Sequence, residues 1–490
     1  MDILKYNGIP EAHGISSSDI TDFISDLARR ELFMHSFILL QDGVVIAEGY
    51  WPHFNKDRNH RMYSVSKTFV ATAIGALIDE GKLSLDDSIM KFFPEYADAD
   101  ELLHLTTIRD LLIMATPHRS TTYSVNAKNW TETFFKTQPH HPSGTLFNYD
   151  TSGSYILDVI VQRVSGKPFL EYLKDRMLRE IGFTENTDVV KAPEGISWGG
   201  SGVLCTTRDL ARLAQLYMDK GRFNGKQLLS EEFINAATSK QIDNCYNGWK
   251  TNTDGHGYGY QIWRTRDNSY SFLGMGGQLA ISIPDKRLIL CTNADVQGLP
   301  TNYEGIFEAL WNFIVTHMSD SPLPECPADY DKLIETLADL KFPIPAGENF
   351  SSCEQEVFNR KYIVKDTGIS EFSFRRDGNN GIFSYTNRTG SHSYEFGFGE
   401  YLNITFPETH YFGDTIGTPL GRGYDALAAA VWVEPRKLML RTFLTDDYFG
   451  NWCGVFAFKG DRVTVGLSKT AEWFLDEYTG FGSGIAADAM

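Results

Sequence analysis

Ser64 and Lys67 are the residues of this sequence best suited to chemistry, because they stand three positions apart in the segment Ser-Val-Ser-Lys. Residues three apart share one face of an α-helix, so the lysine amine can reach the serine hydroxyl. A serine in the first helical turn also lies near free backbone N–H groups, which stabilise negative charge on its oxygen. Taken alone, the pair is equally compatible with a capping serine and a solvated lysine.

Lys67 needs a lowered pKa to act as a base at neutral pH, since a lysine normally titrates near ~10.4. The residues that follow it are apolar nearly all round the helix, which predicts a helix buried at the centre of a domain over residues 64–79, with Gly81 as its C-terminal cap. Burial against Phe69 and Val70 disfavours the charged amine.

Tyr149 stands in a polar segment, Phe147-Asn-Tyr-Asp-Thr151, directly before a helical pattern. A tyrosine placed there can present its phenol to a cleft and, beside a cationic lysine, pass a proton between Ser64 and a leaving group. The alternative is a packing tyrosine, because the chain contains 23 tyrosines.

A third segment, Gly274-Met275-Gly276-Gly277-Gln278, lies between two predicted strands. Glycines next to a strand let a ligand approach the backbone closely. The N–H groups of Ser64 and Gln278 are the predicted oxyanion hole, with Met275, Gly276 and Gly277 as substrate-binding positions. A tight hairpin or bulge is the alternative interpretation.

The pattern of elements around these residues predicts an α/β (α+β) domain, in which helices flank an antiparallel sheet and an all-helical lobe is inserted. Expected helices cover residues 15–30, 64–79, 107–114, 155–164, 168–181, 207–220 and 303–316. Expected strands cover residues 37–40 and 43–47, which form a hairpin, and residues 258–263, 269–272, 279–283 and 288–292.

A change to proline and acidic residues over 319–329 predicts a domain boundary. We therefore expect a catalytic domain over residues 1–318, a linker with a short helix over 319–345, and a smaller domain over 346–490. The last of these is rich in strand patterns, at 372–374, 382–385, 394–398, 431–433, 438–444 and 463–465, which predict a β-barrel or sandwich.

In this order, the S-x-x-K, tyrosine and glycine-rich segments resemble the serine β-lactamase and penicillin-binding-protein superfamily, in particular its class C-related esterases and peptidases. The similarity extends over roughly residues 15–315 and includes Met62-Tyr-Ser-Val-Ser-Lys-Thr-Phe-Val70, residues 83–87 and 108–112, and the segment from Gly200 to Leu210. The resemblance implies that Ser64 is the acylated nucleophile, Lys67 its general base and Tyr149 the proton relay to the leaving group.

Two positions depart from the superfamily pattern. Thr151 stands where an asparagine usually ends the tyrosine motif, and keeps only a hydroxyl for a substrate carbonyl. Met275 stands where a lysine or histidine usually opens the third motif, and cannot pair with a carboxylate. We therefore expect weak β-lactamase activity and a small ester, amide or peptide substrate, unless Arg264, Arg266 or His256 supplies the missing charge.

The remaining features limit the function classes. A net charge of −18 disfavours binding to nucleic acid or to anionic membranes. No apolar leader or long apolar segment is present, so a cytoplasmic location is expected, and the six scattered cysteines suit reduced thiols. No H-E-x-x-H motif occurs, and neither a metal nor a cofactor is expected. A homo-oligomer is compatible with the sequence, and a non-catalytic scaffold is the rival function.

Overall fold

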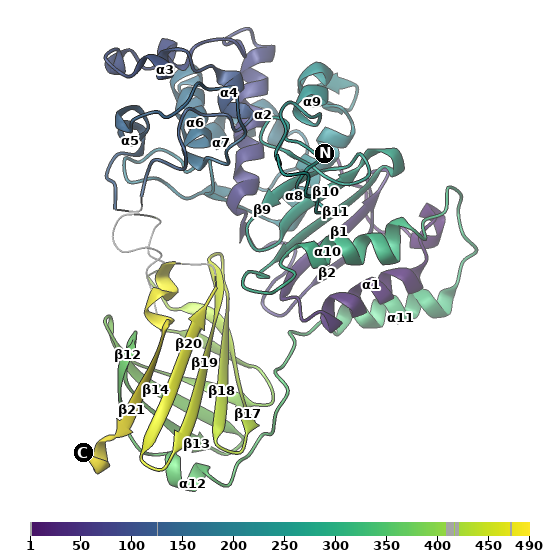
Figure 1. Cartoon of the computed structure of the whole chain (residues 1–490). Helices are drawn as coiled ribbons and strands as arrows, with labels where there is room; N and C mark the ends of the chain where they lie inside the picture. Colours follow the sequence, from purple (N-terminus) through teal and green to yellow (C-terminus); the bar gives the residue numbers. More distant parts are fainter. Residues whose placement is uncertain (1, 125, 408–415, 417–420, 471–472) are drawn as a thin grey trace. The chain divides into compact units, whose positions relative to one another are not determined.

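The computed structural model describes residues 2–124, 126–407, 416, 421–470 and 473–490 (Figure 1). The chain divides into two compact units. Unit 1 comprises Met1–Trp51 and Asn55–Leu340, and unit 2 comprises Pro52–Phe54 and Lys341–Met490. Each unit has its own buried apolar core.

Unit 1 is built around a six-stranded antiparallel sheet with the strand order β2-β1-β11-β10-β9-β8. The predicted opening hairpin forms its first edge and the predicted meander forms the rest. The strands are β1 (Met34–Gln41), β2 (Val44–Tyr50), β8 (Trp263–Arg264), β9 (Tyr270–Gly274), β10 (Gln278–Ile283) and β11 (Leu288–Ala294). All residues of β10 and β11 are buried, which is expected for strands covered on both faces.

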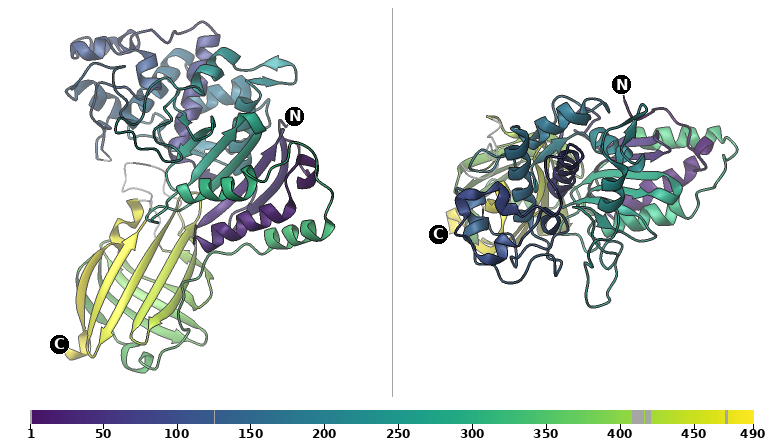
Figure 2. Two further views of the ribbon diagram at one scale, coloured as in Figure 1. Left: turned by 45° about the vertical axis from the view of Figure 1, so that its right-hand side comes forward. Right: turned by 90° about the horizontal axis from the view of Figure 1, so that it is seen from above.

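Helices cover the two faces of this sheet (Figures 1 and 2). On one face, Phe23 of α1 (Ser17–Arg29) packs edge-on against Phe37 of β1, and α10 (Glu304–Leu310) and α11 (Pro327–Ala338) lie beside α1. On the other face, Thr207 of α8 (Thr207–Met218) hydrogen-bonds Ser36 and Asn293. Neighbouring strand residues Ser36 and Phe37 therefore serve opposite faces, as strand geometry requires.

The helical lobe surrounds α2 (Ser66–Asp79), which packs against α6 (Thr151–Ser165) and α7 (Phe169–Leu173). Every residue from Ser66 to Leu77 is buried, which explains why the sequence is apolar all round this helix. The predicted cap is confirmed, since Gly81 has φ +68° and its N–H donates to Ile78 O. The other described helices of unit 1 are α3 (Glu101–His104), α4 (Ile108–Leu112), α5 (Trp130–Lys136) and α9 (Glu231–Ala237). Two small sheets are formed by β3 (His60–Arg61), β5 (Val203–Cys205) and β4 (Asp188–Val189), and by β6 (Arg222–Phe223) and β7 (Lys226–Gln227).

Three predicted elements of unit 1 differ in the structure. The helix predicted over 303–316 is α10 followed by a π-helix at Trp311–Val315. The strand predicted over residues 258–263 is almost entirely irregular, and only Trp263–Arg264 joins the sheet as β8. Its alternating aromatic residues are buried in packing contacts and not in a ladder, since Tyr258 packs against both Phe147 and Trp263. The helix predicted over 168–181 widens into a π-helix at Lys174–Leu178.

Unit 2 is a β-barrel, which decides between the barrel and the sandwich that the sequence predicted. Nine strands close the barrel when β15 pairs in parallel with β17, and β16 adds to β17 outside this closure. The strands are β12 (Tyr362–Thr367), β13 (Ile369–Asp377), β14 (Asn380–Asn387), β15 (Gly390–Phe398), β16 (Leu402–Phe406), β17 (Tyr424–Glu434), β18 (Lys437–Thr445), β19 (Phe449–Lys459), β20 (Arg462–Lys469) and β21 (Gly480–Ala486), and α12 is Glu354–Val357. Buried aromatic side chains such as Phe372, Phe374, Phe383 and Phe456 pack against one another in the core of this unit.

The division between the units falls at Leu340, later than the change in composition at 319–329. The reason is that α11, beyond the proline-rich segment, returns to unit 1 and packs against α1. Leu337 and Leu340 lie so close to Gly49 of β2 that a Cβ there would meet their methyl groups. Across the described parts of the chain, no helix combines the length and apolar character needed to span a bilayer. All six cysteines are free thiols.

Candidate active site

Ser64 lies in a tight turn between a short strand and the buried helix. The N–H of Met62 donates to Val203 O (2.9 Å), which fixes the chain before the turn. Tyr63 has φ +47°, a left-handed conformation that is costly for a bulky residue and is often found at functional sites. Ser64 sits in a 3-10 turn (Tyr63–Val65) that leads directly into α2 at Ser66, so the prediction of Ser64 in the first α-helical turn was wrong by two residues.

Lys67 nevertheless reaches Ser64, as the spacing predicted. Its Nζ donates to Ser64 Oγ at 3.0 Å and to the carbonyl oxygen of Gly200 at 2.6 Å. The side chain is buried, with 1% of the residue exposed. Burial lowers the pKa of Lys67 to about 7, against a smaller opposing effect of the Asp150 carboxylate. The amine is thus available as a proton acceptor near neutral pH.

Tyr149 lies close to both residues. Burial raises the pKa of its phenol, and a hydrogen bond with Ser64 partly offsets that effect. The Lys67 amine lies 5.0 Å from the centre of the Tyr149 ring, and the ring of Trp263 stacks on Tyr149 at 5.6 Å. Ser64, Lys67 and Tyr149 are therefore brought together, with the phenol protonated and aimed at the serine oxygen.

Asp150 and Thr151 hold Tyr149 at the start of α6. Asp150 caps this helix by accepting from Ser152 N (2.8 Å), and it also accepts from the Thr116 hydroxyl (2.7 Å). The methyl group of Thr151 packs against Gly200, where an added Cβ would lie 2.5 Å away. Thr151 thus lies next to the carbonyl that binds Lys67.

The glycine-rich segment is the turn between β9 and β10. Gly274 ends β9 and pairs with Gln278 at the start of β10, and Gly276 and Gly277 have positive φ angles of 83° and 98°. A Cβ on Gly274 would lie 2.4 Å from Met62 O, so this turn is held against the segment that leads to Ser64. The Gln278 side chain is buried and its Nε2 donates to the carbonyls of Met275 (2.8 Å) and Ala294 (2.7 Å), which fixes the turn.

The sequence comparisons agree with this arrangement. The profile of the beta-lactamase family matches residues 31–303, more than half of the 490-residue chain. The chain belongs to the beta-lactamase family. Its fold is that of the serine β-lactamase and penicillin-binding-protein superfamily, with a β-barrel added after it.

Three similar proteins share a quarter or less of their aligned residues with this chain, which spans about three fifths of the length of the two curated ones. The chain is 25% identical over 231 residues to a 6-aminohexanoate-dimer hydrolase from Paenarthrobacter ureafaciens, covering 43% of this chain and 59% of that protein. It is 24% identical over 234 residues to penicillin-binding protein 4 from Amycolatopsis lactamdurans, covering 41% and 61%. The structure of a putative beta-lactamase from Bacteroides dorei is similar in fold at a TM-score of 0.51 and 18% identity, covering 60% of this chain and 97% of that one.

Within the family site, Met275 is 43% exposed and leaves the position of the usual cation without a charge. The three residues considered as substitutes are bound elsewhere. Arg264 donates to Thr238 O (2.9 Å), Arg266 pairs with Asp267 (3.2 Å) and His256 Nε2 lies 3.0 Å from Thr251 O. None of these contacts involves Ser64 or Tyr149.

Three residues of the site were not predicted from the sequence. Gly200 accepts from Lys67, Trp263 stacks on Tyr149, and the buried Arg61 donates from Nε to Ser201 O (2.7 Å), next to Gly200. The Arg61 guanidinium also lies 5.0 Å from the ring centres of Tyr63 and Trp198. The segment from Gly200 to Leu210 resembled the family, but nothing in its pattern indicated that its first carbonyl binds the lysine.

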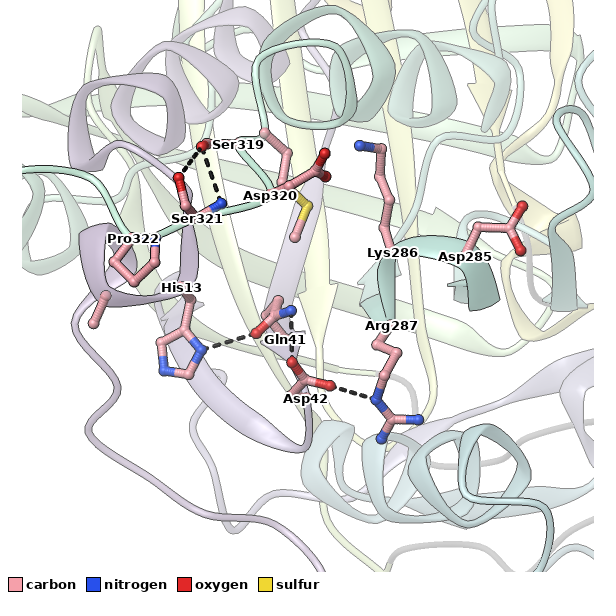
Figure 3. Close-up of a pocket in the computed structure, with 12 residues that line it drawn as sticks. His13, Gln41, Asp42, Asp285, Lys286, Arg287, Ser319, Asp320, Ser321 and Pro322 are labelled. Atoms are coloured by element: carbon pink, nitrogen blue, oxygen red, sulfur yellow. Dashed lines mark hydrogen bonds and ion pairs between the residues drawn. The ribbon is translucent and has the colours of Figure 1, made fainter.

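A pocket of about 360 Å³ lies at the other end of the sheet, beside the turn between β10 and β11 (Figure 3). Several of its polar side chains bind one another: His13 Nδ1 contacts Gln41 (2.9 Å), Gln41 donates to Asp42 (2.9 Å), and Arg287 pairs with Asp42. Arg287 also pairs with Asp219, outside the lining. Since β10 runs from the Gln278 turn to this pocket, the pocket is separate from Ser64 by the length of a strand.

Proposed function

We propose that this family member is a serine hydrolase that acts through an acyl-enzyme on Ser64. The observation that carries the proposal is the 3.0 Å contact between Ser64 Oγ and the buried Lys67 amine, whose pKa is lowered to about 7. A neutral lysine in hydrogen-bond contact with a serine hydroxyl is an activated nucleophile pair. The hydrolase relative and the family assignment support the same reaction class.

In the proposed reaction each of the three side chains has one role. Lys67 takes the proton of Ser64 as Oγ bonds to the substrate carbonyl carbon, and the carbonyl oxygen becomes an anion. We propose that the N–H groups of Ser64 and Gln278 bind this anion. Tyr149 then donates its proton to the departing alcohol or amine as the carbonyl–heteroatom bond breaks, and regains a proton from Lys67. Attack of water on the acylated serine completes the cycle.

The proposed substrate is a small ester, amide or peptide, and β-lactams are predicted to be poor substrates. Met275 offers no charge to the carboxylate that penicillins carry, and Thr151 offers a hydroxyl where the family usually has an amide. The relative from Paenarthrobacter ureafaciens is named for hydrolysis of 6-aminohexanoate dimer, which supports a substrate outside the β-lactams.

Acylation of Ser64 is the direct test. The full chain is treated with a fluorophosphonate probe and weighed intact by mass spectrometry. We expect a single adduct, which Ser64→Ala abolishes and Ser124→Ala, a change at an exposed serine, retains. Absence of an adduct on folded protein would favour the rival function, a scaffold that keeps the fold without the chemistry.

A further inference from the structure

The proton donor Tyr149 is continuous with a group of aromatic side chains. Trp263 stacks on Tyr149 at 5.6 Å, and Phe147 packs edge-on against Trp263 at 5.9 Å. Tyr258 in turn packs against Phe147 at 5.2 Å. The surface that leads away from the phenol is therefore aromatic.

A second loop extends this surface. The hydroxyl of Tyr246 accepts from Phe147 N and donates to Asp243 O, both at 2.8 Å, which ties the loop over residues 243–256 to the segment that carries Tyr149. These two segments expose apolar side chains, since Leu146 is 47%, Tyr246 59% and Trp249 66% exposed. We call Leu146, Phe147, Tyr246, Trp249 and Trp263 the aromatic rim.

Two charged groups near the rim are bound within the loop or to the core. Lys240 pairs with Asp243 (2.5 Å), and Arg264 donates to Thr238 O (2.9 Å). Lys250 is exposed, and its aliphatic part packs so closely on Gly255 that a Cβ there would lie 2.7 Å from its Cγ. Leu146, Tyr246 and Trp249 are the exposed large apolar side chains of these two segments, and an apolar lining is typical of small-molecule sites.

We infer that the aromatic rim binds the leaving group of the substrate, and that this group is an uncharged aryl or alkyl alcohol or amine. The inference rests on the proposed function, in which Tyr149 protonates the leaving group. The departing heteroatom must then lie within hydrogen-bond reach of the phenol. Its substituent is then close to the ring of Trp263, which stacks on Tyr149, and through it to the rest of the rim.

The step balances without any further reactant. For a benzyl ester, the acyl carbon–oxygen bond breaks and a bond from Ser64 Oγ to the acyl carbon forms. The benzyl oxygen leaves with the proton of Tyr149, and Lys67 returns to Tyr149 the proton that it took from Ser64. An aromatic ring on the leaving group gains by being desolvated against the rim, whereas a carboxylate pays to lose its water against apolar side chains.

The test uses three acetate esters that share one acyl group: ethyl acetate, benzyl acetate and 4-carboxybenzyl acetate. For the full chain we expect kcat/KM to be about 10-fold higher for benzyl than for ethyl acetate, and about 10-fold lower for the carboxylated ester than for benzyl acetate. Trp249→Ala should reduce the benzyl-to-ethyl ratio about 5-fold. Phe481→Ala, a matched change at an exposed aromatic residue of unit 2, should leave the ratio unchanged.

Equal kcat/KM for the benzyl and ethyl esters, or a ratio that Trp249→Ala leaves unchanged, would overturn the role of the rim. Either result is distinguishable from failure of the proposed function. If the proposed function fails, Ser64 takes up no fluorophosphonate and none of the three esters is hydrolysed above the Ser64→Ala background.

Discussion

Replacing Lys67 with methionine should abolish most activity, because the neutral amine is the base in the proposed reaction. A lysine with an ordinary pKa of ~10.4 is neutral in only about one molecule in three thousand at pH 7. With the pKa lowered to about 7, half of the molecules carry the neutral amine. Burial therefore raises the concentration of active base by about 10³-fold over an ordinary lysine. Lys67→Met removes the base altogether, and the loss of a general base should lower kcat/KM by about 10²- to 10⁴-fold.

The pH dependence of kcat/KM measures this effect in the unmodified chain. The rate of aryl acetate hydrolysis, corrected with the Ser64→Ala variant, should rise tenfold per pH unit below about pH 7 and level off above it. Tyr149 does not contribute to this rise, since burial raises its pKa. A midpoint near pH 10, or a Lys67→Met variant with undiminished activity, would refute the reasoning.

Stability should also rise with pH, but over a higher pH range than activity. The pKa of Lys67 is lower in the folded chain than in the unfolded chain, so the unfolded chain binds more protons between pH 7 and pH 10. The contribution of Lys67 to the free energy of unfolding is therefore present above about pH 10.5 and lost as the pH falls to about 7. Relative to Lys67→Met, the wild type should gain about 2 kcal/mol between pH 7.5 and pH 9.5 in urea unfolding.

Three further predictions follow from the same structure. Tyr149→Phe should lower kcat about 10²-fold or more for an alkyl ester and less for an aryl ester, whose leaving group needs no proton; equal losses would argue against a proton donor. Arg61→Lys should shift the midpoint of the pH–rate profile, because Arg61 binds Ser201 O and so positions the neighbouring Gly200 O, which accepts from Lys67. An unchanged midpoint would show that the role of Arg61 is purely structural. The buried contact of His35 Nδ1 with His60 Nε2 (2.7 Å) should make the fold sensitive to acid. Burial lowers the pKa values of both histidines, that of His60 to about 3. The free energy of unfolding should therefore be highest above pH 6.5 and fall by about 1.4 kcal/mol per pH unit and per proton as the pH approaches 3. His60→Gln should make this slope smaller in unfolding experiments.

The sequence predicts best those elements whose spacing of apolar residues shows directly which faces are buried. The apolar circumference of the segment after Lys67 predicts a central helix, and α2 is buried along almost its whole length. The spacing of Ser64 and Lys67 likewise predicts their contact, because both residues lie within one turn of the same segment. Local spacing is sufficient for both conclusions.

Contacts between segments that are far apart in the sequence cannot be predicted from local spacing. The acceptor of Lys67 is a backbone carbonyl 133 residues away, and a carbonyl has no residue-specific signature. The strand predicted at 258–263 failed for a related reason, since alternating aromatic residues suit a pleated strand and a packed irregular loop equally well. The position of Ser64 before α2 depends on the left-handed Tyr63, which tyrosine rarely adopts.

Unit 2 is made of two separate segments of the chain, which affects how the protein responds to proteases. Residues 52–54 belong to this unit, and His53 hydrogen-bonds Thr445 (2.6 Å) and Asn403 (2.8 Å) there, although the chain on both sides of them belongs to unit 1. The polypeptide therefore passes between the units three times. A single cut near Leu340 therefore leaves residues 52–54 of unit 2 on the first fragment, and the second fragment lacks the hydrogen bonds of His53 once the two fragments are separated. Unit 2 is thus assembled from two places in the sequence, and residues 341–490 alone are not the whole of it.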